Sequence, residues 1–158
     1  MIVLDGTLGK FRNPPVAHSH MRSPIPASWT PSLLSIFRIV AAFLYMAHGT
    51  QKLFGFPGAK ASAALVLLSW FGIGGIIEAF GGALLLLGMF TRPVAFVAAG
   101  EMAIAYFKVH APGGFWPLVN HGELAALYCF AFLYIAAAGG GPWSIDALLD
   151  RAPRDRSR

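Results

Sequence analysis

The sequence predicts an all-α integral membrane protein, folded as a bundle of four transmembrane helices. Its 158 residues are 56% hydrophobic and only 12% charged, whereas soluble domains are about 45–50% apolar and about 25% charged. The apolar residues form four separate stretches, each close to the roughly 20 residues that a spanning helix needs. The net charge is +5, but the basic residues lie mainly in the tails and one short loop. This placement argues against a nucleic-acid partner and makes the lipid bilayer the first expected partner.

The predicted spans are bounded by ordinary helix signals. The first follows a Thr-Pro pair, which is typical of a helix start, and a run of three glycines followed by proline ends the fourth. In chain order they cover residues 32–54, 69–89, 91–107 and 121–138. Thr91 or Arg92 is the expected cap of the third helix, with Pro93 in its first turn. The apolar residues 61–68 are expected to form a short helix at the surface or tucked into the bundle.

Three regions and an orientation follow from the tails. The regions are a flexible N-terminal tail (1–31), a four-helix transmembrane domain (32–139) and a C-terminal cytoplasmic segment (140–158). The tail lacks the apolar core of a secretory signal, and Met21 is a second candidate for the start of the chain. Eight Lys and Arg residues fall on the side of the termini and three on the other, so both termini are expected to be cytoplasmic. Trp116 on the outer side and Trp143 on the inner side are expected to lie at the membrane interfaces.

Ionisable residues inside the spans are the main candidates for function. Such residues cost at least a few kcal/mol each and face the bundle interior or a cavity. The intramembrane polar candidates are Arg38, Tyr45, His48, Lys52, Glu78, Glu101 and Glu123. Counted from the cytoplasmic helix ends, Arg38 lies about 9 Å deep and Glu101 about 13 Å deep, which predicts a buried ion pair. Glu78 at about 18 Å and His48 at about 24 Å form the second predicted pair.

The spacing of these residues places them on two inward-facing stripes. The stripe on the first helix consists of Arg38, Tyr45, His48 and Lys52. The stripe on the second helix consists of Gly74, Glu78, Gly81, Gly82 and Leu85, whose glycines let another backbone approach. A buried ion pair between such stripes either fixes register and topology or takes part in chemistry, and both interpretations stay open.

Two interpretations also remain for Glu123. It follows Asn120 at the spacing of a helix-capping box. With nearby histidines it could instead contribute to a metal site; these are His48, His110 and His121. No ligand spacing specific to a metal is present, so no metal is assigned.

The remaining polar residues have ordinary structural explanations. Lys52 and Lys108 are expected to extend toward the lipid headgroups, and Asp146 to stabilise a helix N-terminus. Cys129 is the only cysteine, which excludes an internal disulfide and a CxxC motif. It is expected to be a small packing residue.

Three segments together resemble the DoxX family of small four-helix membrane proteins. They are RIVAAFLYMAHGTQKLFG (38–55), EAFGGALLLLGMFTRPVA (78–95), and NHGELAALY (120–128) followed by GGGPWSIDALL (139–149). The resemblance covers about residues 33–149. The positions that match the family pattern are Arg38, His48, Lys52, Glu78, Thr91, Arg92, Glu123 and Asp146.

The resemblance implies a multi-pass protein of the bacterial inner membrane that associates with membrane oxidoreductases, such as thiosulfate:quinone oxidoreductase. A quinone is then the expected cofactor, with His48, Glu78 and Tyr45 as candidate proton donors to its carbonyl oxygens. Any activity is expected to belong to a complex with other membrane or peripheral subunits, and no catalytic residue is assigned. A non-catalytic scaffold or assembly subunit is the alternative, and a carrier of a small solute or protons is a third.

Overall fold

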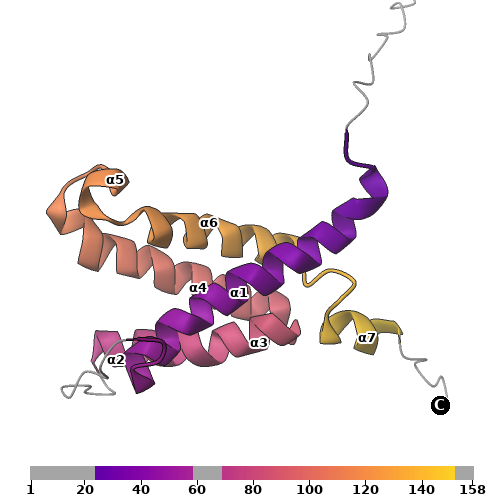
Figure 1. Cartoon of the computed structure of the whole chain (residues 1–158), viewed down its shortest axis with the longest axis horizontal. Helices are drawn as coiled ribbons and strands as arrows, with labels where there is room; N and C mark the ends of the chain where they lie inside the picture. The colour runs from indigo at the N-terminus through magenta and orange to yellow at the C-terminus, as the bar shows by residue number, and fades with distance from the viewer. Residues whose placement is uncertain (1–23, 59–68, 152–158) are drawn as a thin grey trace, which may run out of the picture.

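The protein is helical throughout the part of the chain that the structure describes. The computed structural model describes residues 24–58 and 69–151, and no strand occurs in these two segments. Three helices, Ala27–Phe54, Trp70–Leu87 and Thr91–Gly113, are long and apolar enough to cross a membrane, and a fourth, Glu123–Ala138, is apolar but shorter. Figure 1 shows these four rods packed as a bundle. The predicted all-α membrane fold is therefore confirmed.

The first rod is α1 (Thr30–Phe54), which follows a single 3₁₀ turn, η1 (Ala27–Trp29). It ends at Gly55, whose φ of 71° is left-handed, a conformation that glycine adopts without strain. The predicted span 32–54 agrees with it within two residues. Most of the predicted N-terminal tail (residues 1–23) and the predicted short helix at 61–68 lie outside the described residues.

The second rod contains a wider turn in its middle. It consists of α2 (Trp70–Ile76), the π turn η2 (Ile77–Gly81) and α3 (Gly82–Leu87). The Ser69 hydroxyl caps its start by accepting a hydrogen bond from the Gly72 N–H at 3.1 Å. A π turn inserts one extra residue into a helix and is frequent at functional sites.

The third and fourth rods complete the bundle. The third consists of α4 (Thr91–Ala105), a second π turn η3 (Tyr106–His110) and a 3₁₀ turn η4 (Ala111–Gly113). A short helix α5 (Pro117–Asn120) leads into the fourth rod, α6 (Glu123–Ala138), and α7 (Ile145–Arg151) follows. The predicted cap of the third helix is wrong, because the N-cap is Phe90, in a left-handed conformation with a φ of 51°.

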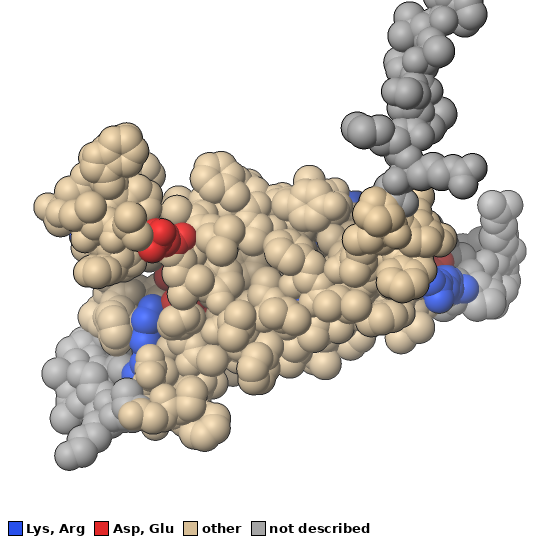
Figure 2. Space-filling view, turned by 45° about the horizontal axis from the view of Figure 1, so that its top comes forward, with Lys and Arg blue, Asp and Glu red and all other residues tan. Residues whose placement is uncertain are grey.

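The two ends of the bundle differ. Figure 1 places the start of α1 and α7 at one end, called here the α7 end, and α5 at the opposite end, called the α5 end. Figure 2 shows charged atoms gathered toward both ends, with a broad uncharged middle between them. That distribution suits a bilayer around the middle. The cytoplasmic placement of the termini and the division into three regions stay predictions.

Close backbone contact holds the first two rods together. A Cβ on Gly49 would lie 2.2 Å from the backbone nitrogen of Ala79, and one on Gly82 would lie 2.7 Å from the Cβ of Met46. Only glycine allows these approaches. The predicted role of glycine in the second stripe is thus confirmed at Gly82.

Aromatic side chains fill the centre of the bundle. Tyr45 and Phe132 are fully buried, with ring centroids 4.8 Å apart in an edge-to-face arrangement. Tyr128 stacks on Phe132 with an interplanar angle of 9°. Leu85 from α3 is also fully buried in this core, which closes the bundle between its two ends.

Candidate functional site

A cavity of about 740 Å³ lies between α1, the second rod, α4 and α6, in the half of the bundle toward the α5 end. Its volume falls in the range of about 300–1,000 Å³ that is typical of small-molecule sites. Most of its wall is apolar. The polar side chains that enter it from the predicted stripes and from α4 are Tyr45, His48, Lys52, Glu78 and Glu101.

An ion pair forms one side of the cavity. The Lys52 ammonium lies 2.7 Å from Oε2 of Glu78, and the two side chains are 22% and 3% exposed. Glu78 is carried by the π turn η2, and Lys52 is carried by the last turn of α1. A carboxylate this deeply buried requires such a partner, because an unpaired buried charge is strongly destabilising.

A second carboxylate, that of Glu101, enters the cavity from α4. The Tyr45 hydroxyl donates a hydrogen bond of 3.1 Å to Oε2 of Glu101. Oε1 of Glu101 lies 3.2 Å, and the Lys52 ammonium 3.9 Å, from the place that a Cβ on Gly74 would take. Glu101 also interacts electrostatically with Glu78. The absent side chain of Gly74 therefore leaves room beside the Glu101 carboxylate and the Lys52 ammonium.

Both π turns contribute to this cavity. Ile77 and Glu78 come from η2, while Lys108 and His110 come from η3. Nothing in the hydrophobic pattern indicated these turns, since an inserted residue changes the local rotation of a helix without changing its composition. π turns are frequent at functional sites, which makes this cavity a candidate site.

The histidines take different positions around the cavity. His48 lines it but is exposed, and its ring lies 6.4 Å from that of Tyr128. Nδ1 of His110 lies 3.1 Å from the carbonyl oxygen of Asn120. His121 lines the cavity at its α5 side. No group of three or more His, Cys, Asp or Glu that could hold a metal occurs in residues 24–58 and 69–151.

The predicted Arg38–Glu101 pair is wrong. Arg38 is fully buried, but its guanidinium donates to backbone carbonyls at the α7 end. The acceptors are the carbonyls of Gly140 at 2.8 Å, Leu86 at 2.8 Å, Trp143 at 2.6 Å, and Leu85. The Leu86 carbonyl lies at the C-terminus of α3, where carbonyls lack a partner within the helix. The Gly140 and Trp143 carbonyls lie between α6 and α7. These carbonyls compete successfully with a carboxylate for the guanidinium.

The second predicted pair, Glu78 with His48, is wrong as an ion pair, although the two residues interact electrostatically. The ion-pair partner of Glu78 is Lys52, one turn beyond His48 on α1. The prediction that Lys52 extends to the headgroups is wrong for the same reason. The predicted inward direction of the first stripe is confirmed for Arg38 and Tyr45, which are both fully buried.

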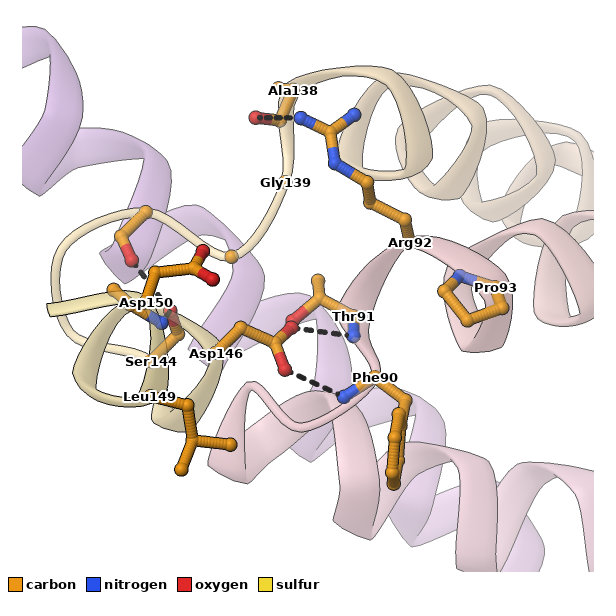
Figure 3. Close-up of a pocket in the computed structure, with 13 residues that line it drawn as sticks. Phe90, Thr91, Arg92, Pro93, Ala138, Gly139, Ser144, Asp146, Leu149 and Asp150 are labelled. Carbon is orange, nitrogen blue, oxygen red and sulfur yellow. Dashed lines mark hydrogen bonds between the residues drawn. The ribbon is translucent and has the colours of Figure 1, made fainter. Parts of the chain in front are cut away.

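A smaller pocket of about 480 Å³ at the α7 end is lined by three further family-matched residues, Thr91, Arg92 and Asp146. Figure 3 shows Asp146 reaching from α7 to the start of α4, where it accepts the Phe90 N–H at 2.9 Å and the Thr91 N–H at 2.8 Å. Burial alone raises the pKa of Asp146, but the Thr91 and Phe90 hydrogen bonds and the Arg38 charge outweigh it and lower that pKa below its usual range. Asp146 does stabilise a helix N-terminus, that of α4.

Arg92 binds the C-terminus of α6 at the same end of the bundle. Its guanidinium donates to the carbonyls of Ala136 at 3.1 Å, Ala137 at 2.5 Å and Ala138 at 3.4 Å, which close the C-terminus of α6. Figure 3 shows this side chain lying against that end of the helix. Arg38, Arg92 and Asp146 are thus engaged in holding helix termini and loop backbone together.

The predicted Asn120–Glu123 capping box is wrong in detail. The Asn120 amide oxygen accepts the Gly122 N–H at 2.8 Å, and α6 begins at Glu123 with no side-chain cap. Glu123 is exposed in the first turn, where its charge suits the helix dipole. Cys129 is half-buried beside the core, as expected of a packing residue.

Comparisons with known proteins place the chain among membrane proteins. Residues 33–111 match the family model described as DoxX. An uncharacterized protein of Haemophilus influenzae is 41% identical over 126 residues, which cover 75% of this chain and 91% of the relative. An uncharacterized membrane protein of Mycobacterium tuberculosis is 24% identical over 141 residues, which cover 79% and 85% of the two chains. No solved structure matches.

Proposed function

The chain belongs to the DoxX family of membrane proteins, and we propose that it binds a quinone in the cavity between α1, α2, α4 and α6, as the membrane subunit of an oxidoreductase complex. The observation that carries the proposal is the convergence of Tyr45, Lys52, Glu78 and Glu101 at the inner wall of a largely apolar cavity. A quinone has a compact head with two hydrogen-bond acceptors and an apolar tail. The cavity offers polar partners and apolar surface in the same arrangement.

The residues of the cavity supply the two functions that a quinone head requires. Tyr45 and Lys52 carry donors that can bind its carbonyl oxygens, and Glu78 and Glu101 carry carboxylates that can release or hold protons. When bound, the quinone supplies the redox chemistry, with electrons exchanged with a redox-active partner subunit. The sequence prediction named Tyr45, Glu78 and His48; the geometry adds Lys52 and Glu101 and leaves His48 at the exposed side.

The carrier interpretation has less support than the quinone interpretation. A solute or proton path would have to run the length of the bundle. Between the cavity and the α7 end the core is filled by Tyr45, Leu85 and Phe132, each fully buried, and Arg38 is held there by four carbonyls. An accessory subunit that only assembles a complex remains the alternative, and it predicts no quinone binding. We place the protein in the bacterial inner membrane, with both termini cytoplasmic, as part of the same proposal.

The test is a titration of the purified protein in mild detergent with decylubiquinone, read as quenching of tryptophan fluorescence. Saturable binding is expected for the unchanged protein, with affinity weakened about tenfold in Glu101→Gln, the effect of losing one charged hydrogen-bonding group. Glu123→Gln is the matched control, because Glu123 is exposed and does not line the cavity; it should bind as tightly as the unchanged protein. Absence of saturable binding, or equal losses in both variants, would refute the quinone site.

The same preparation tests the partnership. Affinity purification from native membranes in mild detergent should recover a flavin-, haem- or iron–sulfur-containing subunit together with this chain. Recovery of the chain alone would refute the oxidoreductase complex. The quinone site would then depend on the titration alone.

A further inference from the structure

The cavity has apolar edges that are open to the outside of the bundle between α2 and α4. Ile73 on α2 is 40% exposed, and Val97 and Ile104 on α4 are 54% and 49% exposed, although all three line the cavity. Side chains that both line a cavity and stand on the outer face of a spanning helix border an opening. Here that outer face is the one that a bilayer would cover.

The packing of the helices explains why an opening lies there. α4 packs along α6 on one side, while its contacts with the second rod are concentrated on η2 and α3. Gly100, at the middle of α4, lines the cavity, is exposed, and has no atom within 4 Å of the place that a Cβ would take. The two rods therefore meet toward the α7 end and separate toward the α5 end, with Gly100 at the gap.

A cation–π contact joins the same two rods again beyond the gap. The Lys108 ammonium of η3 lies 4.2 Å from the centre of the Trp70 ring at the start of α2. Such contacts contribute about 0.5–1 kcal/mol at exposed sites. This contact joins the two rods again on the α5 side of Gly100.

From these contacts we infer that ligands enter the cavity sideways from the bilayer, through a window between α2 and α4. The window is bordered by Ile73, Val97, Gly100 and Ile104 and lies on the α7 side of the Trp70–Lys108 contact. The ligand class is an amphiphile with a compact polar head and a long apolar tail. The head reaches the Glu78–Lys52 pair, and the tail leaves through the window into the lipid. This inference rests on the proposed quinone site and specifies its route of access.

Two ligands that share one head separate the window from the site. They are decylubiquinone and the tail-less 2,3-dimethoxy-5-methylbenzoquinone. Gly100→Phe places a ring in the window, at a position where a Cβ would have no atom within 4 Å. We expect it to weaken binding of the tailed ligand about tenfold, while binding of the tail-less head changes less than about threefold. Val40→Phe, on the exposed face of α1 and away from the cavity, is the control and should change neither.

The outcomes distinguish the window from the binding site. If both ligands bind the unchanged protein and Gly100→Phe weakens both equally or neither, the window is refuted and the quinone site stands. If neither ligand binds the unchanged protein, the proposed function fails and the window fails with it.

A second measurement does not depend on ligand binding or on a bulky substitution. In a Cys129→Ala background, a nitroxide label on Gly100→Cys in lipid bilayers should collide with dissolved oxygen more than with a water-soluble nickel complex. A label on Val40→Cys gives the reference for a lipid-facing position. A label at residue 100 that collides mainly with the nickel complex would show a water-filled opening and overturn the inference.

Discussion

Replacing Arg38 by Met should strongly destabilise the bundle, even though no acidic side chain in residues 24–58 and 69–151 forms a salt bridge with it. The side chain is fully buried, and Met fills a similar volume without a hydrogen-bond donor. Three carbonyls, those of Leu86, Gly140 and Trp143, accept a hydrogen bond from Arg38. A fourth, that of Leu85, also accepts the Gly88 N–H and so keeps a partner.

The magnitude follows from these partners. A buried acceptor left without a partner costs about 1–3 kcal/mol. The bond to Gly140 is buried and those to Leu86 and Trp143 are partly buried, so the first should approach the upper value and the others the lower. Part of the cost is offset because a buried charge is removed. We expect a net loss of about 3–4 kcal/mol in the free energy of unfolding.

The assay is unfolding of the purified protein by sodium dodecyl sulfate in mixed micelles, followed by far-UV circular dichroism. Arg92→Met is the matched control, because Arg92 also donates to carbonyls at a helix end but is exposed; it should cost about 1 kcal/mol or less. Glu101→Gln should not rescue Arg38→Met, since the two side chains act at separate sites. A loss below about 1 kcal/mol for Arg38→Met, or rescue by Glu101→Gln, would refute the reasoning.

Three further results are expected. Gly49→Ala should cost about 3 kcal/mol of folding stability by overpacking, because its Cβ would lie 2.2 Å from a backbone nitrogen of the second rod. Gly100→Ala should be neutral or slightly stabilising. Thermal unfolding in detergent measures both variants, and similar losses of Tm would contradict the close approach of α1 to the second rod. The pKa of Asp146 is lowered in the folded protein, so its contribution to folding stability is fully present above the unfolded pKa of about 3.9 and is lost as the pH falls through the folded value. The difference in Tm between the unchanged protein and Asp146→Asn should therefore shrink on acidification. A Tm difference that is independent of pH would contradict this. Lys52→Met should lower the free energy of unfolding by about 3–5 kcal/mol, because it leaves Glu78 unpaired. Adding Glu78→Gln should restore most of that loss. If the losses of the two single variants simply add in the double variant, the ion pair is ruled out.

The sequence was sufficient to predict the first two spans but not the cap of α4. The first and second spans were predicted within two residues of α1 and of the second rod, because hydrophobicity and length depend on composition alone. The cap of α4 could not be predicted, since Asp146, which closes it, lies 55 and 56 residues further along the chain. A local capping rule examines only neighbouring residues.

The buried charges were found, but their partners were not. Depth along straight helices suggested Arg38 with Glu101 and Glu78 with His48. The depth of a side chain along its helix says nothing of the backbone carbonyls to which Arg38 donates. It also does not fix the helix rotation that brings Lys52 to Glu78. The π turns contribute to that rotation, and their insertion leaves no signal in the hydrophobic pattern.

The structure divides the polar residues between two tasks. At the α7 end, Arg38, Arg92 and Asp146 bind helix termini and loop backbone, so their chemistry is occupied by the fold. Toward the α5 end, Glu78 and Glu101 face a cavity with room for a ligand. The positions that match the family pattern therefore include residues that hold helix termini, such as Arg38, and residues that line the cavity, such as Glu78.

Photolabelling tests the quinone site most directly. A radiolabelled azidoquinone, irradiated with the protein in native membranes and mapped by peptide mass spectrometry, should modify the segments that line the cavity, residues 70–78 and 97–105, and excess decylubiquinone should compete. Labelling confined to the α7-end pocket (residues 90–93 and 138–150), or spread without competition over the lipid-facing helices, would contradict a quinone site in this cavity.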